Sequence, residues 1–294
     1  MPTEPHTRAG HIALAGAPNA GKSSLLNALV GSHLAIVSPK AQSTRLPVVG
    51  LVTTAETQYI FHDLPGLLLP KYALHERMRV SAREALEQVH AVLHLHPASD
   101  APAPPFWPLV GTAPMPELPV LTVYTKIDLI PREQVALLRD GIPISATTRA
   151  GLPELLSGVR QFLPEAPFEF DPDDVGTQPL RFFATEFIRE AAFELLEDEV
   201  PYAIAAEVEE FREHTRPVYI RVTLLVERDS QKGIVIGRGG RTLKAIGQHA
   251  RARLESLLGE QVFLECWVKV LPNWRRNAAS LSRLGFPETV SHKS

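Results

Sequence analysis

The order of apolar and polar positions divides the chain into two different patterns. In the first, short apolar runs alternate with stretches whose apolar residues recur at helical spacing. The apolar runs are 11–15, 48–53, 59–63, 91–96, 119–125 and 142–148, and the clearest helical stretches are 22–31 and 75–90. Strands that alternate with helices are typical of a mostly parallel sheet covered on both faces, so we expect a doubly wound α/β fold.

The second pattern begins after a proline-rich, acidic stretch, residues 165–179, which has no hydrophobic period and is interpreted as a linker. Beyond it we expect helices over 180–200 and 241–259, strands over 202–211, 217–228 and 261–271, and a short terminal helix from about residue 273. The sequence therefore predicts an α/β domain over 1–164 and an α+β domain over 180–294.

The connection between the strands at 91–96 and 119–125 is unusually rich in proline. Its prolines are Pro97, Pro102, Pro104, Pro105, Pro108, Pro114 and Pro116. Parallel strands are usually joined by a helical crossover, but proline costs about 3 kcal/mol inside a helix. We therefore expect a mostly irregular crossover, with at most a short helical turn at 106–110 and with Phe106 and Trp107 packed on the sheet.

Composition narrows the class of protein. The 294 residues suffice for two domains, and 45% hydrophobic and 21% charged residues are typical of a soluble globular protein. No apolar run reaches the roughly 18 residues of a membrane span, and the short polar N-terminus does not resemble a signal peptide. The single cysteine, Cys266, fits a reducing cytosol, and its apolar neighbours favour a buried small hydrophobe over a reactive thiol.

The net charge of −3 conceals an asymmetry along the chain. Residues 215–280 carry 12 Lys and Arg against 5 Asp and Glu, a net +7, which leaves −10 on the rest. A basic block on an acidic body suggests a polyanion partner for that block. On charge alone, a solvated charged face is the alternative interpretation, and the charge by itself does not favour nucleic acid.

The first glycine-rich loop has the chemistry of a phosphate site. Gly16, Gly21, Lys22 and Ser23 satisfy G-x-x-x-x-G-K-S/T between an expected strand and an expected helix. Such a loop curls backbone N–H groups around an anion at a helix N-terminus, the lysine reaches the β- and γ-phosphates, and the serine hydroxyl binds Mg²⁺. This motif predicts a site for the phosphate tail of a nucleotide.

Three shorter strings indicate which nucleotide binds. In "DLPG", Asp63 can hold a Mg²⁺-bound water and the Gly66 N–H can reach a γ-phosphate. In "TKID", Asp128 can accept from guanine N1–H and the exocyclic amine, a donor pair that adenine lacks. In "SA", Ser145 and Ala146 can offer a backbone N–H to guanine O6. Because all three follow strands in the expected order, the sequence predicts a guanine nucleotide site.

The second glycine-rich loop has a different pattern. It consists of Gly237, Arg238, Gly239 and Gly240, and nearby basic residues on the expected same face are Lys232, Arg241 and Lys244. A basic G-x-x-G between two helices is typical of the KH module, which clamps about four nucleotides of a single strand. Taken alone, the motif could also be a tight turn between helices. The helix–strand–strand before it, the helix–strand after it and the +7 charge favour a type II KH domain that binds RNA.

On these motifs the chain resembles the Era family of bacterial GTPases over nearly its whole length. The stretches that carry the resemblance are "GAPNAGKSSLLNALVG", "SPKAQSTR", "DLPGL", "TKIDL", "ISA" and "FIREAAFELLEDEVPYAIAAEVEEF". It implies a Mg²⁺-dependent GTPase with slow turnover that binds the single-stranded 3′ end of 16S ribosomal RNA and assists maturation of the small ribosomal subunit. It further implies a cytoplasmic monomer, in part peripheral to the inner face of the membrane, although the sequence contains no strong amphipathic anchor.

The resemblance also implies roles for particular residues. Those expected to bind GTP or GDP are Gly16, Asn19, Ala20, Gly21, Lys22, Ser23, Ser24, Asp63, Leu64, Pro65, Gly66, Leu67, Thr125, Lys126, Asp128, Ser145 and Ala146. Lys22, Thr44 and Gly66 would act in catalysis, and Ser23, Thr44 and Asp63 would hold Mg²⁺. For the threonine of switch I, Ser43 competes with Thr44, because the register of that segment is open.

The chain departs from the family pattern at the base motif, where Thr125 stands in place of the usual Asn. A threonine offers one short hydroxyl instead of an amide with two donors and an acceptor, so we expect guanine selectivity to persist and affinity to fall. Leu64 replaces a threonine whose side chain catalysis does not require. The proline-rich crossover replaces a connection that usually carries an acidic residue and a good helix.

Water positioning and proton transfer have no obvious residue. Leu67 follows "DLPG" where Ras-like enzymes have a water-orienting glutamine, which predicts slow turnover that depends on a partner or a reorganised loop. The histidines His62, His94 and His96 lie on apolar strands, which favours core or capping roles over catalysis. A KH-type RNA chaperone with a decayed nucleotide site is the alternative to a GTPase switch.

Overall fold

The computed structural model describes residues 7–67, 69–111, 115 and 117–288. The chain folds into two compact units. The first comprises Met1–Ala35, Thr44–Leu69 and Met78–Thr177, and the second comprises Ile36–Ser43, Pro70–Arg77 and Gln178–Ser294. Two short segments of the N-terminal half therefore belong to the second unit.

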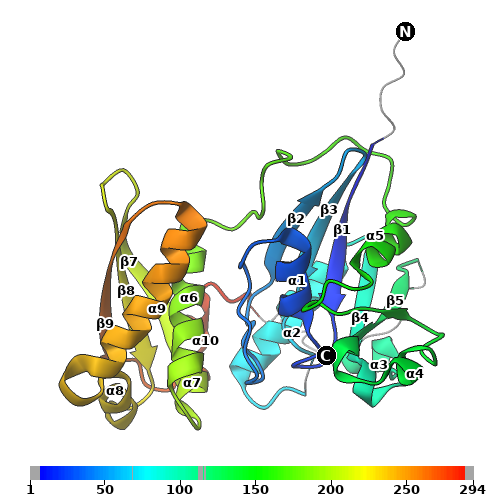
Figure 1. Cartoon of the computed structure of the whole chain (residues 1–294). Coiled ribbons are helices and arrows are strands. Elements are labelled where there is room, and N and C mark those ends of the chain that lie inside the picture. The colour runs from blue at the N-terminus through cyan, green and yellow to red at the C-terminus, as the bar shows by residue number, and fades with distance from the viewer. Residues whose placement is uncertain (1–6, 68, 112–114, 116, 289–294) are drawn as a thin grey trace. The chain divides into compact units, whose positions relative to one another are not determined.

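A six-stranded sheet in the order β2-β3-β1-β4-β5-β6 forms the centre of the first unit (Figure 1). β2 pairs antiparallel with β3, and all other neighbours are parallel. The strands are β1 Arg8–Ala15, β2 Val48–Thr53, β3 Thr57–Asp63, β4 Ala91–Pro97, β5 Val120–Thr125 and β6 Ile142–Pro143. The helices are α1 Lys22–Val30, α2 Ala73–Leu86, whose first residues belong to the second unit, α3 Phe106–Val110, α4 Arg132–Val135 and α5 Leu152–Arg160.

The apolar sequence of β1 explains its central place. Ile12, Ala13, Leu14 and Ala15 are each 0% exposed, as expected of a strand covered on both faces. The loop after β1 leads into α1, which ends at Gly31, whose φ of 78° is readily adopted only by glycine and whose N–H bonds to Asn27 O. The expected doubly wound α/β fold is confirmed.

The proline-rich crossover between β4 and β5 has the predicted character. Among its described residues the longest helix is α3, with five residues, preceded by a 3₁₀ turn at Ala98–Asp100; residues 112–114 and 116 lie outside the described part. Phe106 is 5% exposed and joins a cluster with Val92 of β4 and Leu86 of α2, while Trp107 is partly buried against it. The two aromatic residues thus replace the apolar face of a longer helix.

The stretch expected to be a linker, 165–179, contains neither helix nor strand. It is nevertheless bound to the first unit: the Gln58 side chain donates to Phe170 O at 2.9 Å and accepts from Glu169 N at 2.8 Å. Leu51 N–H donates to Val175 O at 3.0 Å. The first unit accordingly extends to Thr177. The domain limits at 164 and 180 stay a prediction about which pieces fold alone.

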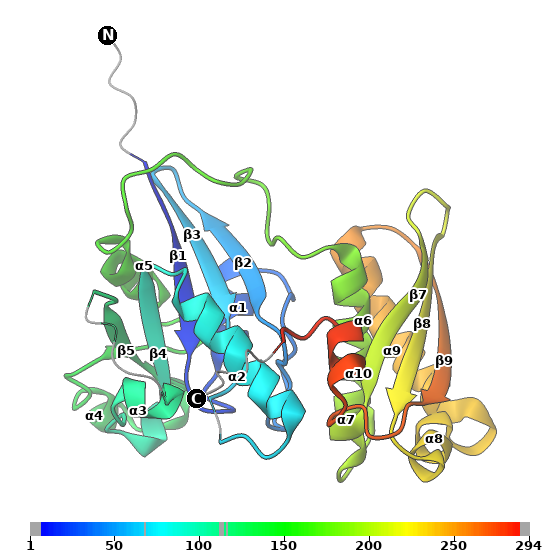
Figure 2. The ribbon, with the colours of Figure 1, turned by 180° about the vertical axis from the view of Figure 1, so that it is seen from behind.

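The second unit contains a three-stranded sheet in the order β7-β8-β9, with β7 antiparallel and β9 parallel to β8. The strands are β7 Ala205–Arg212, β8 Val218–Val226 and β9 Val262–Val270. The helices are α6 Leu180–Leu195, α7 Val200–Ala203, α8 Asp229–Ile236, α9 Arg241–Leu258 and α10 Ala278–Arg283. Helices α6 and α9 run along one face of the sheet (Figures 1 and 2). This order of elements is the expected α+β arrangement of a KH domain.

Three expected boundaries in this unit were wrong. The helix expected to reach residue 200 ends at Leu195, because Leu196 is extended and Asp198 has a positive φ of 52°. Pro201 lies in the first turn of the separate helix α7, so the next strand begins at Ala205 instead of residue 202. The terminal helix begins at Ala278, where the Asn277 side chain accepts from Ser280 N, later than expected.

Candidate nucleotide and RNA sites

The phosphate loop joins β1 to α1 with two positions that require glycine. A Cβ on Gly16, whose φ is 152°, would lie 2.3 Å from Leu95 O, and Gly21 caps α1 with a φ of 91°. The turn therefore keeps its backbone close to the strand ends and free of side chains, which leaves the helix N-terminus open to an anion.

Lys22 supplies a buried positive charge at the centre of this loop. Its side chain is 6% exposed, and Nζ donates to Gly16 O at 3.2 Å and to Ala17 O at 2.9 Å. Burial lowers the pKa of Lys22 to about 8, while the nearby Asp63 carboxylate acts in the opposite direction. Lys22 is thus mostly protonated at neutral pH, and a phosphate group would offset the cost of its burial.

Three oxygen-bearing side chains meet beside Lys22. The Ser23 hydroxyl donates to Asp63 Oδ2 at 2.6 Å. The Thr44 hydroxyl lies 3.0 Å from Ser23 Oγ and donates to Asp63 Oδ2 at 3.2 Å. Two hydroxyls and a carboxylate in this compact arrangement suit Mg²⁺, which prefers oxygen ligands and keeps several of its waters. The side chains present therefore fit a Mg²⁺–nucleotide complex.

Thr44, and not Ser43, is brought to this group of oxygens. Thr44 is 6% exposed and belongs to the first unit, together with Ser23 and Asp63. Ser43 belongs to the second unit, where its carbonyl accepts a hydrogen bond from Arg189 at 2.7 Å. The geometry thus favours Thr44 in the choice that the sequence left open.

The "DLPG" turn returns from β3 to the phosphate loop. Gly66 lies against Pro18, since a Cβ on Gly66 would be 3.0 Å from Pro18 Cα, and Leu67 N–H donates to Gly16 O at 3.0 Å. Leu64 and Leu67 are 0% and 8% exposed and belong to the apolar core, with Pro65 buried between them. A side chain buried in the core cannot orient an attacking water, which agrees with the expectation for Leu67.

A cavity of about 220 Å³ adjoins the phosphate loop. Its lining residues are Gly21, Ser24, Leu25, Thr125, Lys126, Asp128, Leu129, Ile144, Ala146 and Thr147. Asp128 lies in a single 3₁₀ turn after β5, and Lys126, with a φ of 60°, donates through Nζ to Asn19 O at 2.8 Å. A carboxylate on the wall of a partly apolar cavity beside a phosphate site is the arrangement that a guanine base requires. The apolar walls Leu25, Leu129 and Ile144 had no distinguishing sequence signal.

Thr125 retains one connection to the phosphate loop. Its hydroxyl is buried and donates to Ala20 O at 2.8 Å. The base motif and the phosphate loop are therefore tied together by this hydrogen bond and by the one that Lys126 donates to Asn19 O.

Of the two residues expected near guanine O6, only Ala146 lines the cavity. Ser145 is 0% exposed, its N–H donates to Ala150 O at 3.0 Å, and its Oγ accepts from Thr148 N at 3.0 Å. Ser145 therefore shapes the loop, whereas Ala146 lies on the wall of the cavity.

The histidines on the strands have structural partners. His94 is 2% exposed against the Phe106 ring, and His96 Nε2 donates to Asp100 O at 2.8 Å. His62 Nε2 lies 2.9 Å from His11 Nδ1. Burial lowers the pKa values of His62 and His94 to about 4, with a smaller contribution from the neighbouring histidine in each case. The predicted core and capping roles account for all three.

The second glycine loop joins α8 to α9 with positive φ at three of its residues, 70° at Gly237, 62° at Gly239 and 77° at Gly240. A Cβ on Gly237 would lie 2.2 Å from the Thr242 hydroxyl. Glycine at these three positions keeps Cβ atoms away from the loop, as the close approach of a sugar-phosphate chain requires.

A groove of about 370 Å³ lies between α9 and β9. It is lined by Gly240, Leu243, Lys244, Gly247, Gln248, Arg251, Leu264 and Cys266. Of the residues expected to bind RNA, Gly240 and Lys244 line this groove. Lys232 lies in α8, Arg238 and Gly239 lie in the loop, and Arg241 is the first residue of α9. Gln248 and Arg251 were missed, although spacings of four and seven residues from Lys244 put them on one helix face. Burial raises the pKa of the Cys266 thiol to about 12, which agrees with an unreactive side chain.

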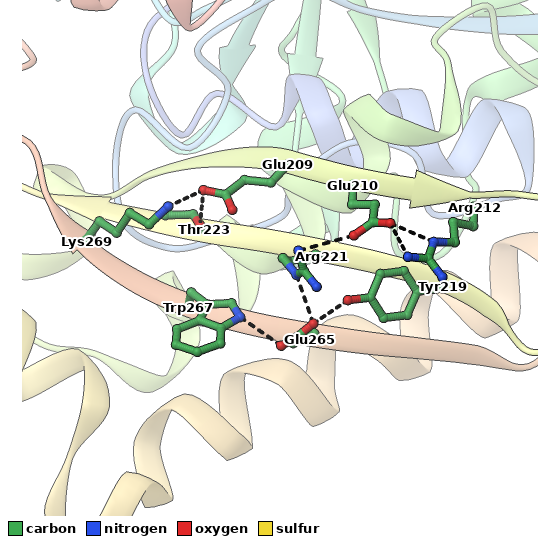
Figure 3. A network of polar contacts seen from close by, with 9 residues as sticks. All are labelled: Glu209, Glu210, Arg212, Tyr219, Arg221, Thr223, Glu265, Trp267 and Lys269. Atoms are coloured by element: carbon green, nitrogen blue, oxygen red, sulfur yellow. Dashed lines mark hydrogen bonds and ion pairs between the residues drawn. The ribbon is translucent and has the colours of Figure 1, made fainter.

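The basic residues of the second unit fall into two groups. On the sheet, Glu265 accepts from Tyr219, from Arg221 at 2.9 Å and from Trp267 at 2.9 Å, and these hydrogen bonds, that of Tyr219 foremost, lower its pKa to about 2 (Figure 3). The neighbouring cations are paired in the same way, Arg212 with Glu210 and Lys269 with Glu209. By contrast, Lys232, Arg238 and Lys244 form no ion pair within the described residues. Positive charge without an ion-pair partner among the described residues therefore lies around the G-x-x-G loop.

Comparison with known proteins identifies both units. Residues 11–109 match a family model described as 50S ribosome-binding GTPase, and residues 199–275 match a KH domain model. A GTPase Era from Lacticaseibacillus paracasei is 39% identical over 288 residues, which cover 94% of this chain and 96% of that protein.

Two solved structures are similar over 96% of this chain and 100% of their own, at 36% identity. One is Era from Aquifex aeolicus bound to GDP and AlF4⁻, with a TM-score of 0.89. The other is Era in complex with MgGDPNP and nucleotides 1506–1542 of 16S ribosomal RNA, with a TM-score of 0.90.

Proposed function

The chain belongs to the Era family of GTPases, and we propose that it is a slow switch whose nucleotide state governs its binding to the 3′ end of 16S ribosomal RNA. It is a P-loop GTPase with a KH domain, it uses GTP, GDP and Mg²⁺, and its role is in maturation of the small ribosomal subunit. The observation that carries the proposal is the group formed by Lys22 and the Ser23, Thr44 and Asp63 oxygens, because these are the side chains that a Mg²⁺–nucleotide complex requires.

The residues divide the work of phosphoryl transfer between them. Lys22 and the loop N–H groups hold the β- and γ-phosphate oxygens, and Ser23, Thr44 and Asp63 hold the metal, directly or through water. The Gly66 N–H orients the γ-phosphate. GTP bound with Mg²⁺ supplies the group to be transferred and a cation that spreads its negative charge. Leu67 is apolar and buried and cannot orient the water, so turnover without a partner is slow.

Base selection rests on Asp128 and on the Ala146 N–H. The Asp128 carboxylate accepts from N1–H and the exocyclic amine of guanine, and Ala146 donates to O6. Adenine presents an acceptor where guanine presents N1–H, so it leaves the carboxylate without its partner. The hydrogen bond from Thr125 to Ala20 supports a base loop that is still held in register with the phosphate loop.

RNA binds at the G-x-x-G loop and along the groove between α9 and β9. Gly237, Gly239 and Gly240 let the sugar-phosphate backbone approach, and Arg238 and Arg241 contact its phosphates. Lys232, in the helix α8 that precedes the loop, adds positive charge beside the RNA, while Lys244 lines the groove itself. The absence of ion pairs for Lys232, Arg238 and Lys244, among the residues that the structure describes, supports this side of the unit over the sheet as the polyanion site.

The family resemblance further supports a cytoplasmic monomer. A fraction of the molecules would be bound peripherally to the inner face of the membrane. None of the described helices is long and apolar enough to cross a bilayer. Sedimentation with anionic vesicles, together with light scattering of the free protein, tests both statements.

The deciding experiment measures nucleotide affinity with and without a short single-stranded RNA that contains CCUCC. We expect micromolar GDP and GTP binding in Mg²⁺, no competition by ATP, and a different RNA affinity in GTP and GDP. The rival interpretation is a KH-type RNA chaperone with a decayed nucleotide site. RNA affinity that is the same with GTP, with GDP and without nucleotide would favour the rival, because a decayed site couples nothing.

A further inference from the structure

One face of α6 carries three charged side chains that are almost completely buried. Glu186, Arg189 and Glu190 are 6%, 5% and 1% exposed and lie three and four residues apart, so they share one face of the helix. Buried charges are costly unless they are paired and hydrogen-bonded. Their partners therefore indicate what this face of α6 holds.

Arg189 holds the end of the 36–43 segment, the part of the second unit that precedes Thr44. The guanidinium donates through Nη2 to Ser43 O at 2.7 Å, and through Nη1 it pairs with Glu186 one turn earlier in the helix. The planar fork of arginine lets one side chain make both contacts, and Glu186 fixes the orientation of the guanidinium.

The beginning and the middle of the same segment are also bound to α6. Val37 N–H donates to Glu190 Oε1 at 2.9 Å. Lys40 Nζ donates to Phe193 O at 2.6 Å and also to Leu196 O, at the end of the helix where carbonyls lack intrahelical partners. Helix α6 therefore holds the segment at three points over seven residues.

The contact between Arg189 and the Ser43 carbonyl acts on Thr44 through one peptide group. The Ser43 carbonyl and the Thr44 N–H belong to the same planar unit, so a hydrogen bond that fixes the carbonyl also fixes the direction in which Thr44 begins. The Thr44 hydroxyl in turn lies 3.0 Å from Ser23 Oγ and 3.2 Å from Asp63 Oδ2. A shift of the Ser43 carbonyl must therefore alter how well Thr44 reaches this group of oxygens.

We infer that Arg189 is a positioning residue for the GTP-bound state: from helix α6 of the RNA-binding unit it holds the Ser43 carbonyl and thereby presents the Thr44 hydroxyl to Mg²⁺ and the γ-phosphate. This inference rests on the proposed role of Thr44. Because that role exists only when a γ-phosphate is bound, Arg189 favours GTP over GDP. The same helix also contacts α9, since Glu190 pairs through Oε2 with Arg253 at 3.0 Å, so the helix that begins at the G-x-x-G loop shares a carboxylate with the 36–43 segment.

The test compares affinities for a non-hydrolysable GTP analogue and for GDP, both in Mg²⁺, in the full-length protein. Two substitutions avoid an isolated buried charge: R189K keeps the charge but not the fork, and E186Q combined with R189M removes the pair. We expect about tenfold weaker binding of the GTP analogue in the double variant and a smaller loss in R189K, with GDP affinity unchanged. R221Q, which removes another arginine–glutamate contact of the same unit (Figure 3), is the control and should leave both affinities unchanged.

Thr44→Ala separates this inference from the proposed function. If Arg189 acts through Thr44, then T44A alone weakens the GTP analogue, and adding the E186Q/R189M pair to T44A weakens it no further. Wild-type affinity in both Arg189 variants, equal losses for GDP and the GTP analogue, or fully additive losses with T44A would overturn the positioning role. If T44A itself has no effect on the GTP analogue, the proposed role of Thr44 is wrong and the inference falls with it.

Discussion

The single hydrogen bond between Thr125 and Ala20 should be measurable in nucleotide affinity. In Thr125→Val the side chain keeps its shape but loses the hydroxyl that donates to Ala20 O at 2.8 Å. In the free protein the loop can relax so that water hydrogen-bonds to the Ala20 carbonyl, but with nucleotide bound it cannot. The lost hydrogen bond therefore destabilises mainly the nucleotide-bound state.

The size of the effect follows from the burial of the contact. Thr125 is 4% exposed. A net hydrogen bond contributes about 1 kcal/mol and a buried carbonyl left without a donor costs about 1–3 kcal/mol, so we take about 1–2 kcal/mol for a loop that relaxes in part. The Kd for GDP should then rise about five- to thirtyfold. The Kd for GTP should rise by the same factor, because the contact touches neither the γ-phosphate nor the metal.

Thr125→Asn tests the same contact in the opposite direction. The amide can donate to Ala20 O and still offer a second donor and an acceptor, and the 220 Å³ cavity that Thr125 lines has room for the longer side chain. We expect binding to tighten by about 1 kcal/mol, or about fivefold.

Fluorescence titration with a labelled GDP measures both variants, and Thr122→Val, on the same strand but outside the nucleotide loops, is the control. An unchanged Kd in Thr125→Val would refute the view that this bond couples the two loops. An unchanged or weaker Kd in Thr125→Asn would mean that the site compensates for the missing asparagine elsewhere.

Three further predictions concern the base, the RNA and acid. Asp128→Asn should shift preference from guanine to xanthine nucleotides, because the amide can donate to xanthine O2; competition titration checks this, and retained guanine preference would remove Asp128 from the site. Replacing Arg238 and Lys244 with Ala should weaken single-stranded RNA and flatten the salt dependence of its binding while GTP affinity stays the same, so unaltered RNA affinity would move the site away from the G-x-x-G loop. Burial lowers the pKa of His94 to about 4 in the folded protein, whereas the usual pKa of a histidine is near 6.5. As the pH falls below 6.5, the unfolded chain therefore gains a proton at His94 that the folded chain does not, and the folded state loses stability. With a folded pKa of about 4, linkage makes the loss of stability between pH 7 and pH 5 about 2 kcal/mol. Urea denaturation of His94→Gln should show a correspondingly smaller loss over that range; the same loss as in the wild type would assign the acid sensitivity to other groups.

Local chemistry explains why the nucleotide motifs could be predicted from the sequence. Gly16, Gly21 and Lys22 act through backbone shape and spacing within one loop, and both can be inferred from residue types and their order in the sequence. The crossover was equally predictable, because proline acts on its own turn of helix whatever the surroundings, and α3 stops after five residues. These features depend on few residues, all close in the chain.

Features that depend on distant contacts could not be predicted in the same way. The 36–43 segment has no hydrophobic period, and its partners on α6 lie about 150 residues further on, as for Arg189 and Ser43. Within α6 there was a signal: Glu186, Arg189 and Glu190 interrupt a helix otherwise rich in apolar residues, on one face. Charged residues at that spacing on a helix in the core imply a buried partner, although they do not identify it.

The two segments of the N-terminal half that belong to the second unit suggest how nucleotide binding and RNA binding are coupled. Ile36–Ser43 ends one residue before Thr44, and Pro70–Arg77 begins four residues after Gly66, so both residues expected to meet the γ-phosphate continue into segments that pack in the RNA-binding unit. The second segment is also hydrogen-bonded within this unit: Leu74 N–H donates to Arg275 O at 3.0 Å, and Arg77 donates to Phe286 O at 3.1 Å. A connection through residues 165–179 alone would leave the two units independent of the γ-phosphate. A change in the direction of the Thr44 backbone, in contrast, acts directly on Ser43, whose carbonyl Arg189 of the second unit holds.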